Sequence, residues 1–233
     1  MDWMKYDLIT FGCSHTYGAG LPDCWIPNKG HGPKPSNSAW PSVLKQKLNF
    51  KSLDNSSRPG ASNKMIAKTI IEYPEYTKQS VVVVLWANYI RHTIYTNKNK
   101  NLHMLPQMMN GKFKHIIQRG VDKDDFVRKV KSYYEDFYEE FDSIFDQTIR
   151  MNYIHAFLKS KGILNFHLIQ EHSWGDHKKY FNKFMIGNIH AKTFNWKKDF
   201  KIDDALDKPD PHPGLASHVH LSNFIKEWLD SCD

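Results

Sequence analysis

Short apolar segments alternate along this chain with longer amphipathic ones, and this alternation restricts the folds that the chain can adopt. The clearest short segment is the β-branched run at 81–84, and 6–11, 50–54 and 163–169 also read as buried strands. Between them, apolar residues recur every three to four positions, as on the buried face of a helix. Strands that alternate with helices predict an α/β fold of three layers, with a mostly parallel, flavodoxin-like sheet.

The expected helices follow from capping residues and periodicity. They are a helix capped by Ser38, a helix capped by Ser62 or Asn63, a long helix or broken helix pair over 126–149 that Gly162 ends, and a closing helix over 215–229. Residues 93–121 and 172–200 have no clear period and read as two inserted loop regions. We therefore expect one domain over 1–233 with these two insertions.

Composition excludes several classes of protein. With 40% apolar and 24% charged residues, the chain can bury a core and is not mainly disordered. Its longest apolar run, 81–86, is too short to span a bilayer, and the N-terminus lacks the layout of a signal peptide. Its three cysteines have no CxxC spacing, which argues against a disulfide framework and a cysteine zinc site. We expect a cytoplasmic protein with no membrane partner and no cofactor.

Polar residues follow each predicted strand, and the carboxyl ends of parallel strands meet at one edge of a sheet. The residues delivered there are Ser14, Asn55, Gly60, Asn88, Asp210 and His212. Attack on an ester by a serine needs a base to accept its proton and donors to hold the oxyanion that forms. The set contains all of these parts.

Four segments, in this order, resemble the blocks of the SGNH, or GDSL-like, hydrolase family, particularly the variants found in bacteriophage genomes. They are Phe-Gly-Cys-Ser-His-Thr at 11–16, Asn55 through Gly-Ala-Ser-Asn at 60–63, Trp-Ala-Asn at 86–88 and Asp-Pro-His-Pro at 210–213. With their flanks they cover about a fifth of the chain. Their order and spread are more specific than any one motif.

The resemblance implies a role for each matched residue. Ser14 would be the nucleophile, with His212 as base and Asp210 as the acid of the triad. The main-chain N–H groups of Ser14 and Gly60 and the side-chain amide of Asn88 would form the oxyanion hole. No metal is implied.

Some positions depart from the family pattern. Cys13 replaces the usual aspartate of the first block, which mainly supports the turn; a nucleophilic role for Cys13 itself is the less favoured alternative. Trp86 stands where the family usually has glycine, which would narrow the pocket. Trp86 and Arg91 are the candidate substrate-binding residues.

Two histidine questions stay open at this point. One residue separates Asp210 from His212 where the commonest family form has two, so Asp207 or a main-chain carbonyl could orient the imidazole instead. His218 and His220 suggest a metal site, but two residues apart on a predicted helix they face different directions. We favour core or surface histidines.

The resemblance implies a serine esterase that hydrolyses acyl esters, most concretely acetyl esters of a small molecule or carbohydrate. An acyltransferase with the same acyl-enzyme and a non-catalytic binding protein of this fold are the alternatives. The formal net charge is +7, with six basic residues and no acid over 91–121 and six lysines over 172–200. These stretches favour an anionic ester, and nucleic acid stays open as a partner.

Overall fold

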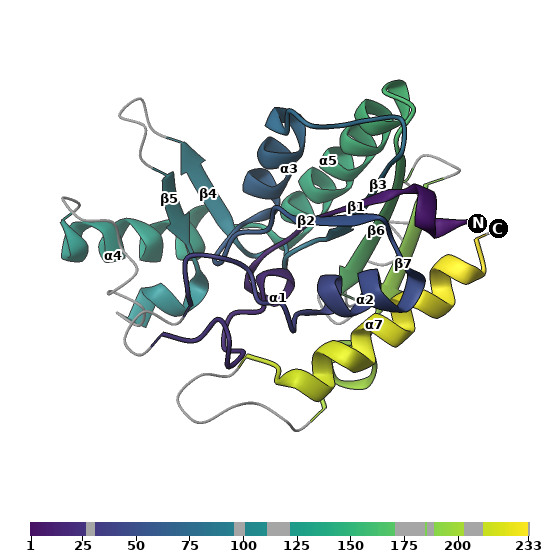
Figure 1. Ribbon diagram of the computed structural model, residues 1–233. Helices are drawn as coiled ribbons and strands as arrows, with labels where there is room; N and C mark the ends of the chain where they lie inside the picture. The colour runs from purple at the N-terminus through teal and green to yellow at the C-terminus, as the bar shows by residue number, and fades with distance from the viewer. Residues whose placement is uncertain are drawn as a thin grey trace.

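Figure 1 shows the computed structural model of the chain, which describes residues 1–26, 31–95, 101–110, 122–170, 185, 189–202 and 212–232. Its centre is a parallel sheet with the strand order β2-β1-β3-β6-β7. These strands are β1 (Asp7–Phe11), β2 (Ser52–Asn55), β3 (Ser80–Leu85), β6 (Leu164–Gln170) and β7 (His190–Phe194). This is the order of flavodoxin-like sheets, which confirms the predicted fold class.

The central strand β3 is buried along its whole length. Val81, Val83 and Leu85 face one apolar cluster, and Val82 and Val84 face a second cluster on the other side of the sheet. A parallel strand covered on both faces has no exposed side, and this explains its unbroken apolar run.

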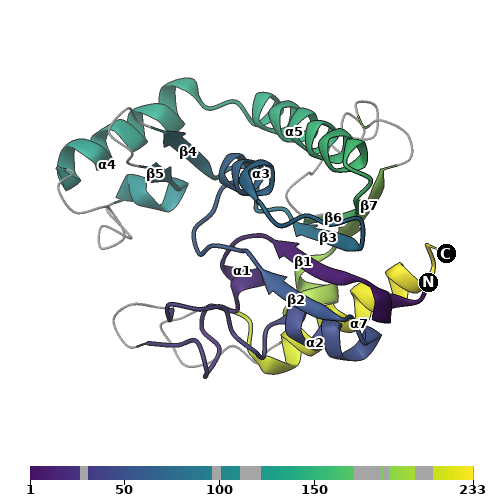
Figure 2. The same cartoon turned by 45° about the horizontal axis from the view of Figure 1, so that its top comes forward.

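One face of the sheet is covered by α2 (Trp40–Leu48) and α7 (Leu215–Asp230), which lie side by side in Figures 1 and 2. The predicted cap Ser38 does not begin α2. The helix begins after Ala39, which has no capping side chain, and the N–H of Trp40 instead donates to Nδ1 of His218 on α7 at 3.1 Å. A side chain from the opposite end of the sequence thus replaces a local cap.

The other face is covered by α3 (Asn63–Glu72) and α5 (Glu140–Ser160), as Figure 2 shows. Ser62 caps α3 as predicted, accepting a hydrogen bond from the N–H of Met65 at 3.4 Å. Gly162 ends α5 with a φ of 73°, and the N–H of Ile163 returns to the carbonyl of Leu158 at 3.0 Å, which is a Schellman motif. None of the helices in the described residues is both long and apolar enough to cross a bilayer.

The long helical pattern over 126–149 is a broken pair. The helix α4 (Lys123–Ser132) is separated from α5 by one π-helical turn, η4 (Tyr133–Phe137). In Figure 1, α4 lies away from the main sheet, beside the antiparallel hairpin of β4 (His92–Tyr95) and β5 (Asn101–Met104). The short helix η2 (Pro106–Asn110) packs against α4. The described part of the predicted 93–121 insertion therefore has its own small sheet and apolar cluster.

The structure differs from the loop expected over 172–200. Within that range, β7 pairs in parallel with β6, and the π-helical turn η7 (Trp196–Phe200) follows it. The strand carries His190, Lys192 and Thr193 among its residues and is mostly half-buried at the sheet edge. It therefore lacks the apolar pattern by which the other strands were found.

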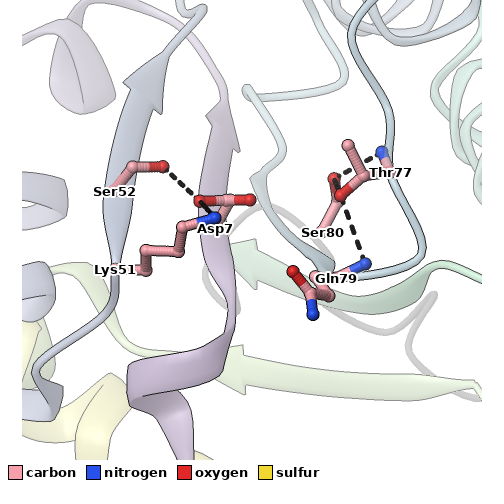
Figure 3. Close-up of polar contacts among 6 residues, drawn as sticks. All are labelled: Asp7, Lys51, Ser52, Thr77, Gln79 and Ser80. Carbon is pink, nitrogen blue, oxygen red and sulfur yellow. Dashed lines mark hydrogen bonds and ion pairs between the residues drawn. The ribbon is translucent and has the colours of Figure 1, made fainter.

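Figure 3 shows two groups of polar contacts at the amino ends of the central strands: one joins β1 to β2, and the other lies within the turn that leads into β3. After the short helix η1 (Trp3–Lys5), the carboxylate of Asp7 on β1 accepts a hydrogen bond from Ser52 on β2 at 2.7 Å. The hydroxyl of Ser80, where β3 begins, accepts from the N–H of Thr77 at 2.9 Å. These contacts lie at the amino ends of the strands, whereas the predicted functional residues follow the carboxyl ends.

Candidate active site

The first predicted block forms a tight turn between β1 and α1 (Ser14–Tyr17). Cys13 precedes the helix as its N-cap, and Ser14 is the first helical residue, with 6% of its surface exposed. A Cβ added at Gly12 would overlap Oγ1 of Thr16 and lie 2.7 Å from Cβ of Thr16. Glycine therefore lets the chain turn this sharply and place Ser14 just beyond the end of β1.

The second block is bonded directly to the first. Nδ2 of Asn55 donates to the carbonyl of Thr16 at 2.8 Å, and the N–H of Arg58 donates to the carbonyl of Gly12 at 3.1 Å. Oδ1 of Asn55 accepts from the hydroxyl of Ser57 at 2.5 Å. Asn55 therefore supports the loop and the turn, and does not point its amide at a substrate.

Gly60 lies in a turn that depends on its positive φ of 76°, in which the N–H of Ala61 donates to the carbonyl of Arg58 at 3.1 Å. An added Cβ at Gly60 would meet no heavy atom within 4 Å. Glycine is thus needed here for backbone conformation, and the space beside it is open.

The third block continues from β3. The N–H of Trp86 donates to the carbonyl of Leu168 on β6 at 3.0 Å, one residue beyond the end of β3. Oδ1 of Asn88 accepts from the N–H of Ile90 at 3.0 Å. Because the oxygen end of the Asn88 amide is engaged in this way, the amide nitrogen is the end left to bind a ligand.

The three predicted oxyanion donors share one property. Among the residues that the structure describes, the main-chain N–H groups of Ser14 and Gly60 and the side-chain N–H groups of Asn88 donate no hydrogen bond. Adjacent parallel strands bring them to one edge of the sheet, since Phe11 pairs with Val84 and β1 also pairs with β2. Unused donors that gather beside a serine are suited to stabilise an oxyanion.

The predicted base returns to this edge from the far end of the chain. The ring of His212 lies 5.4 Å, centroid to centroid, from the ring of His15, which directly follows Ser14. The structure thus brings His212 of the fourth block beside the first block. Asp210 and its alternative Asp207 lie outside the described residues, so the predicted acid of the triad stays a prediction.

His15 is enclosed by aromatic rings and by positive groups. Its ring lies 4.4 Å from that of Trp196 and 5.9 Å from that of Phe200. Burial, together with the nearby His212 and Arg91, holds the pKa of His15 well below its usual value. His15 is therefore neutral near pH 7 and places no like charge against a protonated His212.

The two predicted substrate-binding residues have different surroundings. Trp86 is only 2% exposed, and its indole N–H donates to Nδ1 of His167 on β6 at 3.0 Å. Arg91 is half-buried, and its N–H donates to the carbonyl of Asn88 at 3.2 Å. Its guanidinium forms no ion pair within the described part of the chain. Substrate contact stays a prediction for both, and Arg91 has the more accessible side chain.

The histidines considered for a metal site have other partners. His218 is fully buried and accepts from Trp40, while Nε2 of His220 bonds the carbonyl of Lys198 at 2.8 Å. Groups of three or more potential metal-ligating side chains do not occur in the described ranges.

Sequence reasoning gave no individual role in the site to His15, Asn63 or Trp196. Asn63 was the last residue of the second block and a candidate helix cap, yet its side chain bonds the main chain of Ala87. His15 approaches His212, and Trp196 approaches His15, only in the folded chain. The position of His15 next to the nucleophile was the only local signal available.

Comparisons with known proteins support the fold. No protein-family model matches the sequence, and neither does any curated protein. Among solved structures, a G-D-S-L family protein from Desulfitobacterium hafniense matches with a TM-score of 0.51 and 9% identity, over 95% of this chain and 98% of that one. An esterase from Pseudoalteromonas matches with a TM-score of 0.54 and 10% identity, over 96% and 98% of the two chains.

An acetyl xylan esterase from the rumen bacterium Butyrivibrio proteoclasticus matches with a TM-score of 0.57 and 12% identity, over 97% of this chain and 63% of that chain. At such low identities these matches establish a shared fold. The sheet and its two helical layers are those of the GDSL, or SGNH, hydrolases.

Proposed function

We propose that this protein is a serine esterase with Ser14 as nucleophile and His212 as base. The observation that carries the proposal is the group of three unused N–H donors, from Ser14, Gly60 and Asn88, at the edge of the sheet to which His212 returns.

The reaction follows from these positions. Oγ of Ser14 attacks the acyl carbon while His212 accepts its proton, and the three donors hold the oxyanion. His212 then gives the proton to the departing alkoxide as the ester C–O bond breaks. Water, deprotonated by His212, attacks the acyl-enzyme, and the returning proton restores Ser14 as the acid leaves. Asp210 is the group we propose to orient His212.

We propose that the substrate is an acetyl ester on a carbohydrate. Two of the fold relatives are described as an acetyl xylan esterase and a carbohydrate esterase. In this chain Trp196 is half-buried, and its ring lies 4.4 Å from that of His15, the residue that follows the proposed nucleophile. An indole face is suited to stacking against the apolar face of a sugar.

Hydrolysis of p-nitrophenyl acetate by the purified protein tests the esterase proposal. Ser14→Ala should reduce turnover to background, while Ser160→Ala, an exposed serine at the end of α5, should leave it unchanged. A fluorophosphonate probe should label Ser14, as located by peptide mass spectrometry. Undiminished turnover in Ser14→Ala, or a folded protein that the probe does not label, would contradict the proposal.

A comparison of two substrates tests whether the protein acts on a carbohydrate ester. Trp196→Ala should raise KM for acetylated xylo-oligosaccharides by about tenfold, because the stacking surface is lost, and Trp196→Phe should have a smaller effect. KM for p-nitrophenyl acetate serves as the control, since that ester has no sugar to stack. An equal change in KM for both substrates would count against a carbohydrate contact at Trp196.

A further inference from the structure

The side chain of Asn63 bonds both main-chain groups of a single residue. Its Nδ2 donates to the carbonyl of Ala87 at 2.8 Å, and the N–H of Ala87 donates to its Oδ1 at 2.8 Å. Asn63 is 3% exposed and is the first residue of α3. Two such bonds from one rigid amide fix both the position and the orientation of Ala87.

Among the described residues, Asn63 is the one side chain that bonds the main chain of Ala87. The preceding residue, Trp86, still bonds β6 through its N–H and its indole, but there the chain leaves the sheet. Both main-chain polar groups of Ala87 are used by Asn63. Asn88 follows at once, and its oxygen is fixed by the N–H of Ile90. Any rotation at Ala87 would therefore move the amide of Asn88.

Asn63 also connects two of the proposed oxyanion donors. It lies three residues after Gly60, so one short segment carries a donor at one end and the contact to Ala87 at the other. The turn at Gly60 is held by its own main-chain bonds, from Ala61 to Arg58 and from Arg58 to Gly12, so the bonds from Asn63 set where the Asn88 loop lies relative to it.

We propose that Asn63 is a positioning residue, which holds Ala87 so that the amide of Asn88 meets the oxyanion. This inference rests on the proposed esterase function and on the role proposed there for Asn88. Asn63 touches neither substrate nor reacting atoms and acts through Asn88 alone. Its contribution therefore depends on the presence of the Asn88 amide.

A double-mutant cycle measures that dependence. With p-nitrophenyl acetate, Asn88→Ala should lower kcat by about 100-fold or more, the usual loss of an oxyanion donor. Asn63→Ala should lower kcat by about 10-fold to 100-fold, with KM changed less than about twofold. The double variant should be no more than about threefold slower than Asn88→Ala. If the fold-losses of kcat in the two single variants multiply in the double variant, as they would after a general loss of structure, the inference is overturned.

Ser62→Ala is the matched control. Ser62 is equally buried at the start of α3 and is hydrogen-bonded to Thr93 at 2.7 Å, but it has no bond to Ala87. We expect this variant to lose stability and to keep kcat within about threefold of wild type. A fall in kcat as large as that of Asn63→Ala would show that any weakening of the start of α3 lowers kcat, and this would overturn the inference.

Asn63→Asp gives a second test that keeps the size of the side chain. An ionised carboxylate can accept from the N–H of Ala87 but repels its carbonyl, whereas a protonated carboxyl can both accept and donate as the amide does. The kcat of Asn63→Asp, divided by that of wild type at each pH, should therefore rise as pH falls. A ratio that does not change with pH in the folded variant would overturn the inference. The Ser14→Ala result tests the esterase proposal separately, so the two failures are distinguishable.

Discussion

Gly60 and Gly162 both adopt the left-handed backbone conformation beside open space, but only Gly60 lies near the proposed site. Their φ angles are 76° and 73°, and an added Cβ at either would meet no heavy atom within 4 Å. The cost of a side chain is therefore backbone strain alone, about 1 kcal/mol at each site. Gly162 ends α5, whereas Gly60 is a proposed oxyanion donor, so the pair separates strain from function.

We expect Gly60→Ala and Gly162→Ala to lower the free energy of unfolding by a similar amount, about 1 kcal/mol. Only Gly60→Ala should lower kcat for p-nitrophenyl acetate, by about tenfold or more, because relaxation of φ moves its N–H. Urea unfolding and steady-state kinetics on both variants provide the measurements. An equal loss of kcat in the two would contradict a donor role for Gly60.

His167 is a buried titratable residue on β6 that the proposed chemistry does not use. It is 0% exposed, accepts from the indole of Trp86, and bonds Oδ1 of Asn165 through Nε2 at 2.9 Å. Because Nδ1 accepts, Nε2 carries the single proton of a neutral ring. Burial lowers the pKa of His167 from 6.5 to about 3.

The folded protein therefore binds fewer protons at His167 than the unfolded chain does. The contribution of neutral His167 to the stability of the fold is complete above about pH 6.5 and is lost as pH falls toward 3. In that window one such group changes the free energy of unfolding by about 1.4 kcal/mol per pH unit. His167→Gln keeps an acceptor and a donor but does not titrate.

The slope of unfolding free energy against pH reflects how many more protons the unfolded chain binds. We therefore expect His167→Gln to reduce this slope, between pH 6 and 4, by the amount that about one proton contributes. Urea titrations at several pH values measure the slope for this variant and for wild type. An unchanged slope in His167→Gln would show that this ring is not kept neutral by the fold.

At the scale of elements, the turn from β1 to α1 has little steric tolerance. Thr16 is fully buried, and a Cβ on Gly12 would also lie 3.1 Å from the carbonyl oxygen of Leu85 on β3. Neither neighbour is the flexible end of a long side chain. Overlap here must be relieved by moving either α1 or the end of β3.

Gly12→Ala should therefore cost about 2–4 kcal/mol of unfolding free energy, well above the cost of Gly162→Ala. It should also reduce esterase turnover, because α1 carries Ser14. Chemical denaturation of the two variants in parallel checks the difference. Equal losses would mean that the turn adjusts more easily than its contacts indicate.

The break between α4 and α5 has a tertiary cause. Tyr134, in the π turn, donates from its hydroxyl to the carbonyl of Ile90 at 2.6 Å, just after the Asn88 loop. Tyr133 bonds the imidazole of His92 at 3.0 Å. Aromatic residues of the π turn thus join the helix pair to the segment around β4, and the chain becomes extended at Tyr138 directly after them.

At the scale of the whole molecule, the formal net charge of +7 is the property with a functional consequence. The described basic residues Arg91 and Lys201 both act on the pKa of His15, so positive potential reaches the proposed site. Most of the two predicted basic stretches lies outside the described residues. Their effect on substrate choice remains a prediction.

We expect ionic strength to distinguish two kinds of ester. Raising salt from about 50 to 500 mM should lower kcat/KM at least about fivefold for an acetylated anionic polysaccharide, because screening shortens the attraction to a few ångströms. For the neutral p-nitrophenyl acetate the change should stay below about twofold. Initial rates across a salt series measure this, and equal responses would show that the charges only solvate the surface.

The sequence alone predicted the central strands, and it placed the first three blocks after the carboxyl ends of β1, β2 and β3. Those features follow from local rules: β3 is recognisable because burial on both faces requires an unbroken apolar run, and Gly162 because a helix end of this kind requires positive φ. The positions of Ser14, Gly60 and Asn88 then follow, since parallel strands end at a common edge.

Only the tertiary structure revealed β7, the cap that His218 gives to α2, the contact of His15 with His212 and the bonds from Asn63 to Ala87. The strand β7 is mostly half-buried and carries no apolar period, so pairing with β6 alone identifies it. The three contacts join side chains that are distant in sequence. No periodicity encodes them, because they depend on the packing of whole layers, which sets each side chain's neighbours only after the sheet and helices have assembled.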